Sequence, residues 1–156
     1  MRTPRFWQPV AAMAIGGASL FGAMAAHAIY NPPIHMVNGV EYMSGGIGTE
    51  EAELMETVSP RWPATFEFAV KDEKRADFAA DVLVTVRNAS GEPVLRDIVS
   101  NGPMLVARLE AGRYEVEATL GGRTLKQQVD VVQGSASRTV FVWPTGTSLS
   151  ALAPAK

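Results

Sequence analysis

The sequence predicts an all-β fold: a seven-stranded antiparallel β-sandwich with one short helix before it. Two features of the 156-residue chain predict this fold. After Pro63, apolar and polar residues alternate with a period of two, which is typical of strands that bury one face. Turn-forming residues separate these runs at intervals of about ten residues, as in sandwich folds, and this spacing leaves no room for the crossover helices of a parallel sheet.

The alternating runs define the seven strands, and short segments rich in Gly, Pro, Asn or Ser join several of them. The expected strands cover residues 66–70, 82–87, 94–99, 104–109, 114–120, 125–131 and 138–143. We therefore expect one β-sandwich domain over residues 63–144. The Ala-, Pro- and Ser-containing segment 145–156 is expected to be a disordered tail.

Residues 29–62, which precede the sandwich, are expected to be mostly irregular. Asn and Pro residues at 31–33 prevent regular strand pairing, and the glycine-rich segment 45–48 is typical of a flexible loop. Residues 40–43 predict at most one short edge strand.

One short helix is expected within this segment, over residues 50–58. Thr49 is a suitable N-cap, and the acidic residues of the first turn favour the positive end of the helix dipole. Pro60 is expected to end the helix. A helix of this length is not stable alone in water, so its apolar stripe has to dock on another element.

Residues 1–28 have the features of a secretory signal peptide. Arg2 and Arg5 form a basic start, an apolar stretch covers 10–26, and small residues end at Ala28. The apolar stretch is shorter than the roughly 20 residues that a membrane-spanning helix needs. We therefore expect cleavage between Ala28 and Ile29, no membrane association of the product, and a periplasmic or secreted location.

The composition narrows the functional classes. The chain has no cysteine, so the expected domain is held together by packing rather than by disulfides. Removing Arg2 and Arg5 from the 14 basic residues leaves 12 against 16 acidic ones, and the basic residues are scattered. Nucleic-acid binding needs a concentrated positive surface, so we do not expect that function.

Two segments carry a resemblance to a known family. Segment 94–120 contains a small-residue turn, an apolar strand and the pattern L-x-x-G-x-Y, formed by Leu109, Gly112 and Tyr114. Segment 82–91, V-L-V-T-V-R-N-A-S-G, is similar to an early strand-and-turn pattern of the same family. Over about residues 64–143 the chain resembles the carboxypeptidase regulatory-like (prealbumin-like) β-sandwich, a fold with Ig-like architecture.

This resemblance has functional implications. In its parent family the domain is an accessory to a peptidase catalytic domain, and this chain shows nothing similar to that catalytic domain. The glycine-rich segment 44–48 followed by an acidic helix is similar to a group of exported bacterial proteins with the same fold. The resemblance therefore implies an exported stand-alone binding module without peptidase activity.

Gly112 and Tyr114 are expected to have structural roles. Gly112 lies between two strands, where a positive φ costs glycine little. Tyr114 falls on the inward side of the next strand, where its ring can be buried while its hydroxyl bonds to the backbone, as in the tyrosine corner of sandwich folds. The alternative is a ring that stacks on a ligand.

Catalysis and metal binding are not expected. Without the signal peptide His35 is the one imidazole, and it lies in the proline-rich start, so neither a His/Cys zinc site nor a serine–histidine pair is predicted. Carboxylates at Asp72, Glu73, Asp77 and Asp81 alternate with basic residues, which is more typical of a solvated hairpin than of a calcium loop. We expect no enzyme activity and no cofactor.

The remaining candidates are binding residues. Trp62, at the entry to the first strand, is the best candidate for a partly exposed ring, although a tryptophan that covers the end of the sandwich is the favoured alternative, and Tyr42 is a second aromatic candidate. The partly apolar runs 94–99 and 138–143 are candidate edge strands to which a partner strand can add. The sequence thus predicts a non-enzymatic binding module of the cell envelope with an envelope protein or a glycan as partner. The alternative function is carbohydrate or cell-wall binding through exposed aromatic rings.

Overall fold

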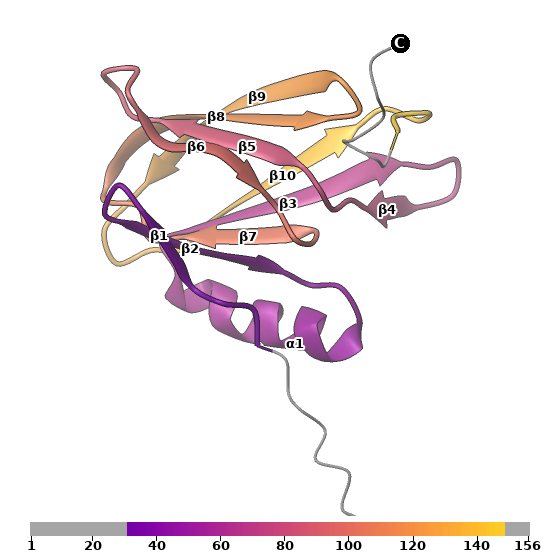
Figure 1. Ribbon diagram of the computed structural model, residues 1–156, viewed down its shortest axis with the longest axis horizontal. Helices are drawn as coiled ribbons and strands as arrows, with labels where there is room; N and C mark the ends of the chain where they lie inside the picture. The colour runs from indigo at the N-terminus through magenta and orange to yellow at the C-terminus, as the bar shows by residue number, and fades with distance from the viewer. Residues whose placement is uncertain (1–30, 149–156) are drawn as a thin grey trace, which may run out of the picture.

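A computed structural model describes residues 31–148, and in this part of the chain strands dominate (Figure 1). The elements are β1 (His35–Val37), β2 (Val40–Gly45), α1 (Thr49–Val58), the 3₁₀ helix η1 (Ser59–Arg61), β3 (Ala64–Lys71), β4 (Ala76–Phe78), β5 (Leu83–Arg87), β6 (Pro93–Val99), β7 (Met104–Ala107), β8 (Gly112–Leu120), β9 (Arg123–Val131) and β10 (Ser137–Trp143). The prediction of an all-β sandwich with one short helix is confirmed. The count of seven strands is wrong, because ten are present in the described residues: β1, β2 and β4 were not counted.

The strands form two sheets that face each other (Figure 1). The first has the order β1-β2-β7-β3-β10, with β4 also paired to β3, and the second has the order β6-β5-β8-β9. All pairs are antiparallel except β10 and β3, which run parallel with Phe141 opposite Phe68. The expectation of a purely antiparallel fold is therefore wrong. Between β3 and β10 the chain passes through the strands of the second sheet. These strands make the crossover connection that a helix usually makes between two parallel strands.

The main core lies between the sheets and follows the period-two pattern. Phe66 and Phe68 of β3 and Phe141 and Trp143 of β10 are fully buried. The rings of Phe68 and Trp143 lie 6.3 Å apart, and the Trp143 indole Nε1 donates a 2.9 Å hydrogen bond to the carbonyl oxygen of Arg123. This bond satisfies the polar atom of a buried tryptophan, as such rings usually require.

Residues 31–48 are more regular than the sequence predicts. β1 and β2 form a hairpin, and β2 pairs with β7 with Ser44 opposite Leu105. The Ser44 hydroxyl also accepts a 2.9 Å hydrogen bond from the backbone N–H of Asn101. The short strand expected at 40–43 is therefore present, but β2 lies between β1 and β7 and is not an edge strand, because its partner β7 is distant in sequence.

Helix α1 begins one residue earlier than expected, and Thr49 is not its N-cap. Gly48 occupies the N-cap position with φ 82° and makes no side-chain capping bond. The Glu51 carboxylate reaches back instead, and its Oε1 accepts hydrogen bonds from the N–H groups of Gly46 at 2.7 Å and Ile47 at 3.4 Å. A first-turn carboxylate thus fixes the glycine-rich segment that precedes the helix.

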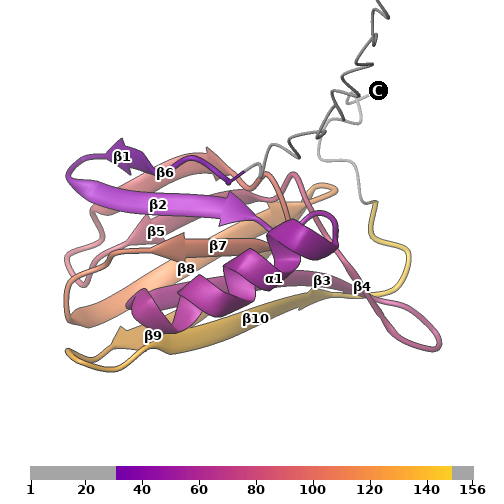
Figure 2. The same ribbon diagram turned by 90° about the horizontal axis from the view of Figure 1, so that it is seen from below.

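The helix docks on the six-stranded sheet, as its short length requires (Figure 2). Met55 of α1 is fully buried and belongs to a second core cluster on the outer face of β2 and β7. The other buried members of this cluster are Met43, Trp62, Met104 and Val106. The six-stranded sheet therefore packs on both sides: against the second sheet on its inner face and against α1 on part of its outer face.

Two expected segments lie wholly or partly outside the described residues. The signal peptide at 1–28 and its cleavage site at Ala28 and Ile29 are outside them, as are residues 149–156 of the expected tail. The start of that tail is ordered, since the backbone N–H and the hydroxyl of Thr147 both donate to the carbonyl oxygen of Pro144.

Candidate functional site

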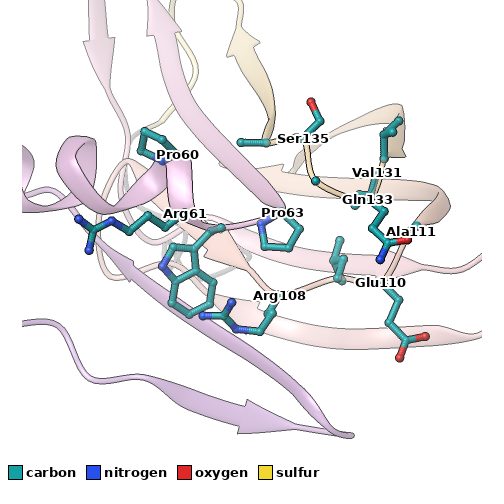
Figure 3. A pocket seen from close by; sticks show the side chains of 14 residues that line it. Pro60, Arg61, Pro63, Arg108, Glu110, Ala111, Val131, Gln133 and Ser135 are labelled. Carbon is teal, nitrogen blue, oxygen red and sulfur yellow. The ribbon is translucent and has the colours of Figure 1, made fainter.

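A pocket of about 680 Å³ opens at one end of the sandwich, and three connections line it (Figure 3). They are residues 60–63 between α1 and β3, residues 108–111 between β7 and β8, and residues 131–136 between β9 and β10. Loops at one end of a rigid sandwich are common binding positions. Because Trp62 lies in the first connection, this pocket is where the sequence places a ligand.

The structure corrects the expectation that Trp62 is partly exposed. The residue is only 5% exposed and packs with Met55 in the core under α1. The guanidinium carbon of Arg108 lies 4.5 Å from the centre of its ring, a cation–π contact that covers part of the remaining surface. Arg108 is itself held by Glu41, whose Oε2 accepts a 2.8 Å hydrogen bond from Nε. Trp62 is therefore a structural residue of this end and offers no free ring face.

The other groups of this pocket form a mixed polar surface. The Arg61 side chain extends away from the wall that contains Glu110 and Gln133, so the pocket does not gather its charges at one point (Figure 3). Ser135 lines the pocket, whereas His35, the imidazole of the described residues, does not. The Arg61, Gln133 and Ser135 side chains can donate hydrogen bonds to a ligand and Glu110 can accept them, but they do not make the nucleophile–base pair that covalent catalysis needs.

Tyr42 lies on the opposite face of the six-stranded sheet from Trp62. Its partly buried ring packs against the main core and stacks on His35 of β1, with 5.1 Å between the ring centres. Trp62 belongs to the helix-side cluster. The two aromatic candidates of the sequence are thus separated by the sheet and do not form one site.

Gly112 and Tyr114 lie together at the start of β8. Gly112 has φ 158°, close to a fully extended backbone. The Tyr114 ring is buried, and its hydroxyl donates a 2.8 Å hydrogen bond to the carbonyl oxygen of Glu110, which is the geometry of a tyrosine corner. Burial, with a smaller effect of the Glu110 charge, raises the pKa of Tyr114, because both disfavour the phenolate.

A second hollow, which the sequence did not indicate, lies between α1 and the β3–β4 hairpin. This groove has a volume of about 860 Å³, and the exposed ring of Phe78 forms part of its wall. Phe78 stands in a segment that the sequence presents as a charged hairpin loop. The feature of the sequence that could have indicated this groove is the isolated phenylalanine among those charged residues.

The sheet next to this groove has an uncovered apolar surface. Pairing places Val142 of β10 opposite Ala69 of β3, and Ala69 opposite Phe78 of β4. Phe68 and Phe141, which precede Ala69 and Val142 in their strands, point into the main core. Side chains alternate between the two faces of a strand, so Ala69, Val142 and Phe78, which lies opposite Ala69, point away from the main core. Together with Val140 they form what we call the outer-face patch: the exposed residues Phe78, Val140 and Val142, with Ala69, itself only 6% exposed, between them. In it Phe78 is 75%, Val140 45% and Val142 48% exposed.

An ion-pair network borders the outer-face patch. Arg138 of β10 donates to both carboxylate oxygens of Glu56 on α1, at 3.0 and 2.7 Å, and also contacts Glu67 of β3. The hydrogen bonds from Arg138 lower the pKa of Glu56, and its two acidic partners raise the pKa of Arg138. The network ties the last turn of α1 to the sheet.

The carboxylates around the β3–β4 hairpin do not converge. In residues 31–148 no group of three or more His, Cys, Asp or Glu side chains is placed to hold a metal ion. Asp77 pairs instead with Arg75 at 3.6 Å, and Asp72 accepts a hydrogen bond from the backbone of Glu73.

Comparisons with known proteins add no family assignment. No family model matches the chain, and no curated protein is significantly similar to it. Neither helix of the described segment has the length and apolarity that would let it cross a bilayer.

Proposed function

We propose that this protein is a non-enzymatic binding module, exported to the cell envelope, that holds a partner protein on the outer face of its six-stranded sheet. One observation carries the proposal: α1 covers only part of that face and leaves the outer-face patch open. Large apolar side chains gathered on a sheet face are typical of interaction surfaces, whereas single exposed ones are ordinary. Phe78, Val140 and Val142 come from two strands that are distant in sequence, yet they lie on one face.

Export and module type rest on the sequence. The signal-peptide features of residues 1–28 support a periplasmic or secreted location. The pattern formed by Leu109, Gly112 and Tyr114 within a two-sheet sandwich supports a domain of the carboxypeptidase regulatory-like type. Domains of that type act as accessories in their parent family, which agrees with a binding role.

Docking on a sheet face has more support than addition of a partner strand to an edge. At the edge strand β6, Pro93 lacks a backbone donor and Asp97 has φ 51° at a register shift, two features that disfavour further pairing. At the edge strand β10, the Gln127 side chain donates a 2.8 Å hydrogen bond to the carbonyl oxygen of Val140. Both candidate edges are thus partly blocked, and the outer-face patch is the more accessible surface.

Site-specific photocrosslinking in intact cells tests this function. A photoactivatable amino acid is introduced at Val142 in the patch, and in a matched protein at Val99, which is 50% exposed on β6. We expect Val142 to yield a crosslinked product of discrete mass and Val99 to yield none. Equal labelling from both positions, or no product from Val142, would contradict the proposal. The N-terminal residue of the purified product tests export, and the expected residue is Ile29.

Glycan binding is the second candidate function, and the structure gives it less support. Tyr42 is partly accessible, but its ring is already stacked on His35, and the Trp62 ring is buried beneath Arg108. The observation that favours glycan binding is the pocket beside Trp62. A ligand bound there would change the fluorescence of that indole. Titration with soluble glycans is the test, and an unchanged emission spectrum would remove this candidate.

A further inference from the structure

The groove beside the outer-face patch has the shape of a slot along a helix. Its wall on α1 consists of residues at spacings i, i+3, i+4, i+7 and i+8, which form one face of a helix. These residues are Thr49, Ala52, Glu53, Glu56 and Thr57. The groove therefore follows α1 from Thr49 to Thr57, about 13 Å at 1.5 Å per residue.

The other side of the slot is mostly apolar, with Glu67 of β3 as its charged residue. Met104 and Pro103 line it from β7 and the turn before this strand, and Phe78 lines it from β4. Phe78 also belongs to the outer-face patch, so the groove and the patch form one continuous surface. Phe78 is exposed, whereas Pro103 and Met104 are buried at the base of the slot, so a body lying beside α1 would rest mainly on Phe78.

The ionisable residues that line the slot are all acidic, and the cation Arg138 is bound to two of them. These lining residues are Glu53, Glu56 and Glu67, and the ten residues of α1 contain four glutamates and no Lys or Arg. Arg138 neutralises part of this charge, since it contacts Glu56 and Glu67. Glu53 is exposed and makes no side-chain ion pair within the described residues. The cations Lys71, Lys74 and Arg75 lie further along the β3–β4 hairpin and do not line the groove.

We infer that the groove binds a basic amphipathic helix of a partner protein, which lies beside α1 with its apolar side on Phe78. The inference rests on the proposed function and names the chemistry of the partner. Helices pack side by side at about 8–10 Å, so a second helix on this face would complete the layer that α1 begins. Lys or Arg residues on its flank would face Glu53 and the remaining acidic charge of the α1 wall.

A second copy of this chain is a poorer occupant. A symmetric dimer through this surface would bring the acidic wall of one copy close to that of the other, and like charges that face each other weaken an interface. The surface also contains no exposed strand register that a second copy would extend, because the open side of β10 is partly occupied by Gln127.

The test measures binding of two synthetic peptides to the purified protein by fluorescence anisotropy. Both peptides are amphipathic helices of about 18 residues with a leucine face. One carries Lys on its polar face and the matched peptide carries Glu. We expect the Lys peptide to bind at least about tenfold more tightly than the Glu peptide, with an affinity that falls as salt increases.

Three variants locate the binding site. Phe78→Ala is expected to weaken binding of the Lys peptide about tenfold and Glu53→Gln about threefold. Glu50→Gln is the matched control, because it removes the same charge from the same helix at a residue that does not line the groove. Phe78 and Glu53 are exposed, so neither substitution disturbs a core. Equal binding of the two peptides, or equal effects of Glu53→Gln and Glu50→Gln, would overturn the inference.

The peptide-binding test and the photocrosslinking test can fail independently of each other. If the Lys peptide does not bind while Val142 still crosslinks to a partner in cells, the partner chemistry is wrong and the interaction surface remains. A crosslinked product with twice the mass of this chain would identify a second copy as the occupant and would also overturn the inference.

Discussion

The hydroxyl of Tyr114 donates a 2.8 Å hydrogen bond to the carbonyl oxygen of Glu110, four residues earlier in the chain. The bond closes the connection between β7 and β8 over the end of the sandwich. It also explains why a tyrosine rather than a phenylalanine occupies a buried position in β8.

Replacing this tyrosine tests its structural role. We expect Tyr114→Phe to lower the free energy of unfolding by about 1 kcal/mol, because one hydrogen bond is lost while the ring stays in place. The measurement is urea unfolding followed by circular dichroism. Tyr42→Phe is the control, because no hydrogen bond of the Tyr42 hydroxyl stabilises a turn in the described residues. An unchanged unfolding midpoint in Tyr114→Phe would show that the corner is not stabilising.

The same tyrosine makes stability depend on pH in the alkaline range. Burial and Glu110 raise the pKa of Tyr114 in the folded protein above its ordinary value of 10.0. The folded state therefore holds the proton more tightly than the unfolded state. This contribution is complete below about pH 10 and is lost as the pH rises through the folded-state pKa. Unfolding midpoints between about pH 9 and pH 11 should fall more steeply for the natural protein than for Tyr114→Phe, and Tyr42→Phe should keep the steeper fall.

Gly102 is predicted to tolerate no side chain. It lies in the turn between β6 and β7, and an added Cβ would meet the backbone of Gly45 at the end of β2 more closely than real Cβ atoms approach. We expect Gly102→Ala to destabilise the fold by about 1–3 kcal/mol, since backbone rather than a flexible side chain would have to move. Asn101→Ala, in the same turn, is the control and should change stability by less than about 0.5 kcal/mol. The measurement is thermal unfolding of the natural protein, Gly102→Ala and Asn101→Ala.

Arg138 is predicted to give a small acid-dependent stabilisation. Its hydrogen bonds lower the pKa of Glu56 below the ordinary value of 4.5, so the folded state favours the carboxylate. This contribution is present above about pH 4.5 and is lost as the pH falls through the lowered folded-state pKa. Arg138 and Glu56 are exposed and Glu67 is half-buried, so Arg138→Gln should cost about 1 kcal/mol at neutral pH.

Urea unfolding at neutral pH and near pH 3 checks this prediction. The difference between the natural protein and Arg138→Gln should shrink at the lower pH. Arg113→Gln is a matched control, because Arg113 pairs with Asp130 in the second sheet and does not contact α1. If Arg138→Gln loses equal stability at both pH values, packing rather than charge explains the role of Arg138.

The sequence by itself determined the fold class, the seven strands from β3 and β5 to β10, and the helix that became α1. These features depend on local patterns: alternation in strands such as β8, and acidic residues after Gly48 followed by an apolar stripe. The position of Tyr114 at the start of a strand was likewise readable, because the neighbouring glycine and the inward side of β8 are both local signals.

Only the tertiary structure decided which surfaces are covered. β2 gained its partner β7 from about 60 residues further along the chain, so the sequence of residues 40–45 did not show which strand would pair with them. Trp62 is buried because α1 folds over it, and Tyr42 faces the other side of the same sheet. The outer-face patch joins Phe78 to Val140 and Val142 through the pairing of three strands, and such a neighbourhood has no signature in the linear order of residues.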